Sequence, residues 1–294
     1  GGLGTGEHGF GTARFGGKLG DKVAYRGYAK SFTVGEGPVA SGNRGADETQ
    51  QDRAGFRIDA EPSSRDLLTL SADLYQQDYG STNVTEPTFT PPFVAIYDDR
   101  AKSNGGNVLG RWTRRYSNTS NLVVQAYYDR AQKRELGFGT TTDVADIDIQ
   151  HGFEALDRNH VVWGLGYRYG HTEIAESALI RAASTYSRDS QFSAFVQDEI
   201  ALIGDKLRFI IGSKVEHNDS TGVEVQPSAR ILWSPTPTQS VWSAVSRAVR
   251  LPFAGEQVSD ISGAVIPPRT AENPLPLPVE LVARGNPDIV SEDL

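Results

Sequence analysis

Cysteine, basic runs and long apolar stretches are all missing from this sequence. No cysteine occurs among its 294 residues, so no disulfide bond can form, and a chain of this length can bury a core without one. No apolar run approaches the roughly 18 to 20 residues that a membrane helix needs. The formal charge of −8 and the lack of lysine or arginine runs argue against a nucleic acid partner, because neutralising phosphates requires a basic face.

Two further signals are absent. The chain has no methionine and no charged segment followed by an apolar one, which is the pattern of a signal peptide, so we expect its ends to lie inside a longer protein. The mean hydropathy of −0.40 is typical of a soluble protein. A membrane β-barrel, however, alternates polar and apolar residues and averages to the same value, so hydropathy leaves both classes open.

The sequence does contain a clear two-residue period, whereas convincing helical stripes are absent. Over residues 145–155 the odd positions, such as Ile147, are mostly apolar, and the even positions include Asp146 and Asp148. Residues 161–169 repeat this pattern with apolar odd positions. Only a β-strand has a period of two, so the pattern predicts strands with one apolar face and one polar face.

Twelve segments follow this pattern, with lengths close to the 9 to 11 residues or so that cross a bilayer at a tilt. The predicted strands cover residues 10–18, 22–33, 52–60, 67–78, 106–116, 121–132, 144–155, 161–173, 190–202, 207–216, 223–233 and 240–250. Tight turns are predicted at residues 19–22, 62–66, 117–121, 156–160, 203–206 and 234–239. Longer connections are predicted at residues 35–51, 80–105, 134–143 and 176–189, with residues 217–222 as a short exception. Turns at one end and longer loops at the other are typical of an outer-membrane barrel.

The cationic side chains agree with this face assignment. If the apolar face meets lipid, eight cations point into the lumen, namely Arg26, Lys30, Arg53, Arg57, Arg168, Arg208, Lys214 and Arg230. A soluble sandwich with one wet face produces the same alternation. Arg114 shares the apolar face and is tolerable there only near the predicted turn at residues 117–121, where it can snorkel to the interface. Pro227 lies inside a predicted strand and predicts a local bulge.

Motifs that carry chemistry are weak throughout. Residues 164–170, GLGYRYG, contain spaced glycines, but no helix follows them as a phosphate-binding loop requires. Asp146 and Asp148 form either a paired carboxylate or cation site or, as we favour, a solvated lumen face. No metal-ligand spacing relates the five histidines, His8, His151, His160, His171 and His217. We therefore predict no catalytic residue, no metal site and no cofactor.

The segment with the most specific sequence covers residues 195–252, FVQDEIALIGDKLRFIIGSKVEHNDSTGVEVQPSARILWSPTPTQSVWSAVSRAVRLP. It closely resembles the barrel region of TonB-dependent outer-membrane receptors, and residues 16–32, 55–75 and 150–169 support the resemblance. Residues 285–289, GNPDI, resemble a further element of the family, although Val290 and Ser291 replace its usual Lys-Pro. The resemblance implies an all-β fold, a transmembrane antiparallel β-barrel of 22 strands, of which about 12 are present here.

The resemblance also implies a domain organisation and a function. Residues 1–250 are expected to form a partial barrel and residues 251–294 a long extracellular loop, with the plug domain and the C-terminal strands absent from this chain. The family takes up scarce nutrients such as ferric siderophores, energised by the TonB complex through the plug. We thus expect a non-enzymatic receptor in the bacterial outer membrane whose partners are TonB, a small-molecule chelate and membrane lipid. A passive porin and a soluble carbohydrate-binding sandwich or adhesin are the alternatives.

Several residues are candidates for ligand or membrane contact. Residues 87–100 mix aromatics, prolines and charges in an external position, where their aromatic side chains either bind ligand or pack the loop on itself. The ligand-binding candidates are Tyr97, Arg100, His217 and Arg250, because a cationic and aromatic rim suits an anionic chelate. The membrane-interface candidates are Trp163, Trp233 and Trp242. Trp233 and Trp242 flank the turn at residues 234–239 at similar distances, which predicts that both face lipid at similar heights.

Overall fold

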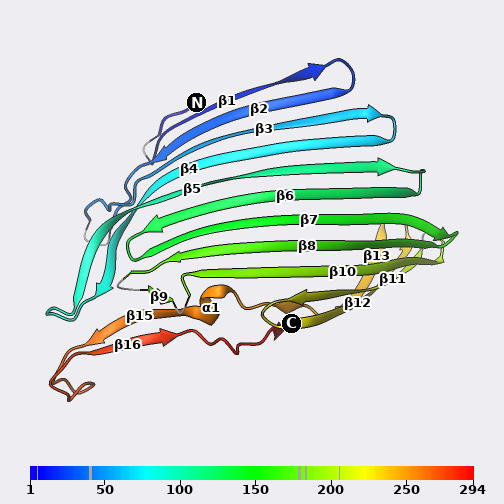
Figure 1. The fold of residues 1–294 in the computed structure, drawn as a ribbon. Coiled ribbons are helices and arrows are strands. Elements are labelled where there is room, and N and C mark those ends of the chain that lie inside the picture. The colour runs from blue at the N-terminus through cyan, green and yellow to red at the C-terminus, as the bar shows by residue number, and fades with distance from the viewer. Residues whose placement is uncertain (5, 40–41, 178–179, 183, 205) are drawn as a thin grey trace.

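Twelve long antiparallel strands form one sheet in the computed structural model of the chain (Figure 1). The structure describes residues 1–4, 6–39, 42–177, 180–182, 184–204 and 206–294. The strands of the sheet are β1 (Glu7–Leu19), β2 (Val23–Val34), β3 (Thr49–Ser63), β4 (Asp66–Pro87), β5 (Val94–Arg115), β6 (Ser120–Glu135), β7 (Phe138–Leu156), β8 (Asn159–Ala175), β10 (Tyr186–Ile203), β11 (Leu207–Asn218), β12 (Gly222–Thr236) and β13 (Gln239–Ser246). Each predicted strand overlaps one of them, which confirms the predicted strand number.

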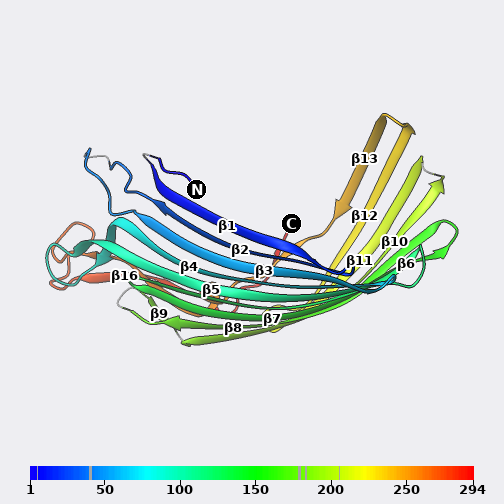
Figure 2. The same ribbon diagram turned by 90° about the horizontal axis from the view of Figure 1, so that it is seen from above.

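The sheet is twisted and curved into a trough, which Figure 2 shows from above. Its order follows the chain, except that β9 (Ile180–Ala182) lies outside it and β8 pairs directly with β10. Within the described residues, β1 and β13 are the two edges of the sheet and do not pair with each other. The strands therefore form an open part of a barrel.

The two ends of the trough differ in how the strands are joined. At one end, which we call the turn end, short turns connect six hairpins, from β1–β2 to β12–β13, at the predicted places. Asp205, in the predicted turn at residues 203–206, lies outside the described residues. The opposite end, which we call the loop end, holds the connections β2–β3, β4–β5, β6–β7, β8–β10 and β11–β12. Residues 40–41, 178–179 and 183 of the predicted longer connections also lie outside the described residues.

Two predicted connections at the loop end are wrong. Instead of a connection over residues 80–105, β4 and β5 extend until only residues 88–93 separate them. Instead of a connection over residues 134–143, only residues 136–137 separate β6 from β7. These strands continue past the apolar band, where the regular alternation of apolar and polar residues that reveals a strand disappears.

The expected bulge at Pro227 is also wrong. Pro227 pairs with Ser213 of β11 in a register that runs without a shift from Asn218 to Leu207. On its other side β13 has already ended, and the carbonyl oxygen of Pro227 accepts a hydrogen bond from the Arg247 N–H at 3.0 Å. The N and C=O groups of one strand residue point to the same side. Pro227 lacks an N–H on the side that faces β13, and the pairing of β13 with β12 has already ended there. No ladder hydrogen bond is lost, so no bulge is needed.

After β13 the chain leaves the main sheet, so the predicted strand over residues 240–250 is too long. β14 (Val249–Arg250) pairs with β17 (Glu292–Asp293), while β15 (Ser259–Ile266) pairs with both β16 (Val279–Arg284) and β9. A short helix, α1 (Ala254–Val258), precedes β15. No helix among the described residues has the length and apolar character needed to cross a membrane.

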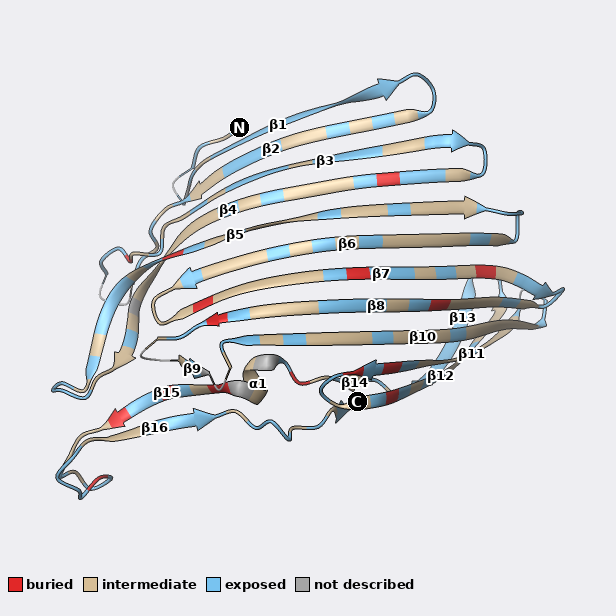
Figure 3. Cartoon of the chain, in the orientation of Figure 1, coloured by how far each residue is buried: buried red, intermediate tan, exposed pale blue. Residues whose placement is uncertain are grey.

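Few side chains are buried along the strands, as the scattered red segments of Figure 3 show. Among the described residues, the buried hydrophobic side chains are Ala101, Ile174 and Val265. Large apolar side chains such as Leu165, Tyr167 and Ile147 are instead 41%, 47% and 44% exposed. A single sheet has no second layer to cover its apolar face, so this face needs another apolar surface.

Candidate functional site

The two faces of the trough differ in polarity. Directly paired residues on neighbouring strands share a face, so the register traces each face across the sheet. It places on one face all eight cations predicted to share it, namely Arg26, Lys30, Arg53, Arg57, Arg168, Arg208, Lys214 and Arg230. Ser291 and Asp293 contact Glu224 and Arg247 on this face. Figure 2 shows the C-terminus inside the trough, so this polar face is the concave one.

An ion pair occupies the concave face where β7 meets β8. Arg168 Nε donates to Asp146 Oδ2 at 2.9 Å, and the Asp146 side chain is 6% exposed against 50% for Arg168. Asp146 Oδ1 has no hydrogen-bond partner among the described residues. The arginine thus compensates the charge of a buried carboxylate while its own far side stays open to the trough. No group of three histidine, aspartate or glutamate side chains in the described part of the chain is arranged to hold a metal ion.

A second polar cluster lies on the same face across β10, β11 and β12. Glu216 is buried and accepts hydrogen bonds from Gln191, Gln226 and Lys214, the last at 2.7 Å. The cluster holds four side chains of three strands in fixed positions along the trough wall. Its members are polar residues at alternate positions, so the sequence pattern predicts their face, but not that they converge on one carboxylate.

The C-terminal segment closes onto the concave face at β12. Arg247 forms ion pairs with Asp293 and with Glu224, the latter at 3.2 Å, and donates to the carbonyl oxygen of Val225 at 2.6 Å. Ser291 donates to the other oxygen of Glu224. Arg247 therefore joins β12 to residues more than forty positions later in the chain. The sequence does not predict this contact, because no local pattern shows where the C-terminal segment folds back onto the sheet.

The four ligand-binding candidates lie towards the loop end, but not on one face. Tyr97 is 45% exposed on the β5 side of the extended β4–β5 hairpin, and Arg100 pairs with Glu48 at 3.1 Å. Arg250 lies beyond β13 and contacts two carboxylates, Glu256 at 2.6 Å and Glu292 at 3.1 Å.

Arg100 pairs with Gly80 on the convex face, and the last candidate, His217, lies on the same face. It pairs with Phe192 and Val223, which places it on the convex face at the end of β11.

The Arg250 guanidinium holds the pKa of Glu256 below its usual value by hydrogen bonding. Arg250 is thus already partly neutralised, whereas Tyr97 is open to solvent.

Aromatic side chains gather on the convex face near the turn end. His151 stacks on Phe153 with ring centroids 5.1 Å apart and meets the edge of Trp163 at 6.0 Å. Arg114 lies over the Tyr116 ring at 5.6 Å, next to the β5–β6 turn as predicted. These residues border the apolar convex surface, as an interfacial aromatic girdle does in membrane barrels.

The predicted arrangement of Trp233 and Trp242 is wrong. Trp233 pairs with Val241, and Trp242 pairs with Leu232, so the two indoles lie on opposite faces of the sheet. The register shifts between Trp233 and Thr236, which moves the partner of Trp233 by one residue. Trp233 keeps the convex position, while Trp242 shares the concave face with Arg230. The membrane-interface role of Trp163 and Trp233 stays a prediction.

A polar concave wall, an apolar convex wall and hairpins of bilayer-crossing length are the features of a membrane barrel. Residues 2–292 match the model of the family described as TonB dependent receptor-like, beta-barrel. The chain belongs to this TonB-dependent receptor family. TonB-dependent receptors are outer-membrane transporters and not enzymes, so membership decides against a porin and a soluble sandwich.

Solved structures show the same fold. The siderophore receptor PirA from Pseudomonas aeruginosa is 12% identical, with a TM-score of 0.68, and the match covers 97% of this chain and 47% of that one. A mutant of the ferric enterobactin receptor PfeA from the same organism is also 12% identical, with the same coverages and a TM-score of 0.73. PirA from Acinetobacter baumannii gives 12% identity and a TM-score of 0.67, covering 97% of this chain and 46% of that one.

The chain thus spans about half the length of these receptors. No curated protein sequence matches it.

Proposed function

We propose that this receptor imports a ferric siderophore or a similar metal chelate across the outer membrane, with energy from the TonB complex. The observation that carries the proposal is the family match over residues 2–292, together with neighbours described as siderophore receptors. In this proposal residues 1–250 form part of the barrel wall and residues 251–294 an extracellular segment. A plug domain of the kind expected for the family contacts TonB.

The concave face suits the passage of a charged, polar chelate. Its ion pairs and amides, such as the Glu216 cluster, offer hydrogen bonds along the wall and replace part of the ligand's hydration shell. No covalent bond of the ligand is made or broken. The proposed task of the protein is to capture the chelate at the loop end and to open a path when TonB displaces the plug.

Arg100, Arg250 and Tyr97 are proposed to contact the ligand. A cationic and aromatic rim attracts an anionic chelate, and hydrogen bonds that involve an ionised group are the strong ones. Glu48 and the carboxylates around Arg250 hold the guanidinium groups in place before ligand arrives. Arg100 and His217 lie on the convex face, so they are weaker candidates than Tyr97 and Arg250.

Uptake of radioactive iron tests the proposed function. Cells that lack the receptor are expected to lose uptake from at least one ferric chelate in a panel, and the cloned receptor is expected to restore it. Adding a protonophore should abolish the restored uptake, because the TonB complex draws its energy from the inner membrane. Unchanged uptake across the panel after deletion contradicts the chelate substrate, and protonophore-resistant uptake contradicts TonB energisation.

Charge removal at the rim tests the site. We expect Arg100→Gln and Arg250→Gln each to weaken chelate binding to the purified receptor about tenfold, the effect of losing one charge-assisted hydrogen bond. Isothermal titration with the chelate identified by the uptake panel measures this. Arg115→Gln, at the turn end of β5, is the matched control and should bind as the unmodified receptor does. Equal affinity of all variants excludes these residues from the site.

A further inference from the structure

The apolar band of the convex face has a definite border on the side of the loop end. On β7 it covers the odd positions of residues 145–153, and on β8 those of residues 161–169, a length close to the 9 to 11 residues or so that cross a bilayer. The next convex positions towards the loop end are Asp143 and His171, which are directly paired. The convex surface therefore turns polar at the height expected for lipid headgroups.

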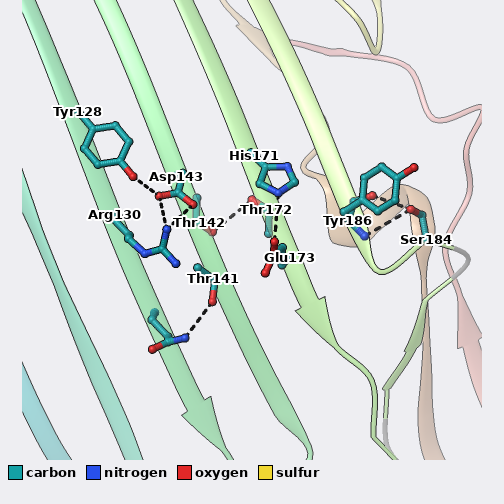
Figure 4. Close-up of polar contacts among 11 residues, drawn as sticks. Tyr128, Arg130, Thr141, Thr142, Asp143, His171, Thr172, Glu173, Ser184 and Tyr186 are labelled. Carbon is teal, nitrogen blue, oxygen red and sulfur yellow. Dashed lines mark hydrogen bonds and ion pairs between the residues drawn. The ribbon is translucent and has the colours of Figure 1, made fainter.

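Cations are grouped beyond this border, with Arg130 directly at it and with Lys102 and Arg134 four residues farther along their strands. Lys102 on β5 lies six residues past Val108, and Arg130 and Arg134 on β6 follow Tyr128, all on the convex face. Arg188 on β10 pairs with His171 and lies over the Tyr186 ring at 5.5 Å. Figure 4 shows Arg130 beside Asp143 and Tyr128, with His171 and Glu173 on the next strand.

Two of these cations face each other directly. Lys102 and Arg134 are cross-strand partners in the β5–β6 register, and like charges in this position repel. The Lys102 side chain is 76% exposed, and its ammonium forms a long ion pair with Asp78 at 3.9 Å. Arg134 is exposed and forms no ion pair with any described residue. In contrast, Arg130 is held by Asp143 at 3.1 Å.

A shallow depression lies beside Arg134. It has a volume of about 260 Å³, and its rim carries Arg130, Gln132, Arg134 and Thr141. Gly139, the partner of Arg134 on β7, forms part of its floor, where an added Cβ would lie 2.8 Å from the Ala175 side chain. Guanidinium, amide and hydroxyl donors, together with the Glu173 carboxylate, thus surround a small space next to Arg134, which has no ion-pair partner among the described residues.

We propose that this cluster, Lys102, Arg130, Gln132 and Arg134, binds the phosphate group of an outer-leaflet lipid headgroup on the outside of the barrel. A phosphate in the depression pairs directly with Arg134 and weakens its repulsion of Lys102, which lies outside the depression on β5. Arg binds phosphate through its planar fork and Lys as a point charge. The position favours lipid over free phosphate, because the site borders the apolar band, where acyl chains already lie against the convex face.

Lipid retention by the receptor purified from outer membranes tests the proposal. After exchange into a neutral detergent, the receptor is titrated with phosphatidylglycerol or with an uncharged galactolipid, and bound lipid is counted by native mass spectrometry. The unmodified receptor is expected to retain phosphatidylglycerol in preference to galactolipid. Lys102→Gln combined with Arg134→Gln should lower its apparent affinity about 30-fold, since each cation near the surface contributes about a factor of five.

The concave face supplies a matched control. Lys30 and Arg53 are also a directly paired lysine and arginine, but they face the interior of the trough, where Arg53 lies 3.6 Å from Asp73. Lys30→Gln combined with Arg53→Gln should leave phosphatidylglycerol retention unchanged. Equal retention by the Lys102 and Arg134 double variant overturns the proposal, and so does complete displacement of the lipid by millimolar inorganic phosphate, which indicates a site for the free ion.

Discussion

An arginine in place of Ile149 is expected to keep most of the receptor from assembling in the outer membrane. Ile149 is central in the apolar band, between its partners Val124 on β6 and Leu165 on β8. An arginine on the lipid face at the bilayer midplane costs about 2 to 4 kcal/mol, which lowers the ratio of assembled to unassembled receptor about 30-fold or more. The amount of receptor whose gel mobility changes on heating measures assembly.

The neighbouring residue gives the control for this prediction. Gln150 pairs with Gly164 and Val123, so it faces the concave side, where many cations already lie. Gln150→Arg introduces the same side chain one position along the strand and should assemble in nearly the amount of the unmodified receptor. If both variants assemble equally well, or if only Gln150→Arg fails, the assignment of the two faces is wrong.

The faces could be predicted from the sequence because a strand has an exact side-chain period of two. Charged residues within the length of the apolar band, such as Arg168 and Lys214, then report the face of the whole strand, and neighbouring strands agree wherever the register is regular. The same logic predicts the hairpins at the turn end, since proline, glycine and asparagine interrupt the period there. The all-β class and the strand number therefore follow from the local pattern, whereas the choice of a barrel over a sandwich rests on the resemblance to the receptor family.

Strand ends at the loop end could not be predicted in this way. In the extended part of the β4–β5 hairpin, beyond residue 78 and before residue 106, apolar and polar residues no longer alternate regularly, so no period remains to mark a strand. Its stability comes from the backbone ladder, which continues to the pair Pro87 and Val94. Backbone hydrogen bonds form with almost any residue type, so the sequence does not reveal where this ladder ends.

The error over the two tryptophans has a different origin. Equal distances of Trp233 and Trp242 from the turn predict a shared face only if the hairpin pairs symmetrically. The hairpin instead shifts register between Trp233 and Thr236, and a shift of one residue moves a side chain to the opposite face. Turn geometry, and not strand pattern, decides such a register.

The candidate site was only partly predictable for a related reason. The position of Arg250 at the loop end follows from the strand order, but its partners Glu256 and Glu292 come from the segment after the sheet. Likewise the contact of Arg247 with Asp293 depends on how that segment folds back. Contacts between distant segments depend on the tertiary path of the chain, which a two-residue period does not encode.

Removing the charge of Arg168 is expected to destabilise the assembled receptor by about 2 kcal/mol. Arg168→Leu leaves the carboxylate of Asp146, whose side chain is 6% exposed, without its cation. Losing one partner of a fully buried pair costs about 3 to 5 kcal/mol, and the half-exposed guanidinium reduces this because water screens the pair. The urea concentration at which heat-modifiable mobility is lost should fall accordingly.

A double-mutant cycle separates the ion pair from a general effect of losing an arginine. Asp146→Asn in the Arg168→Leu background removes the stranded charge and should restore most of the lost stability, because the amide is far cheaper to bury than a carboxylate. Arg230→Leu is the matched control, since Arg230 lies on the same concave face and forms no ion pair with a described residue. Its effect should stay within about 0.5 kcal/mol. A loss in Arg230→Leu as large as in Arg168→Leu, or no recovery in the double variant, means that the charge of Asp146 is compensated by groups other than Arg168.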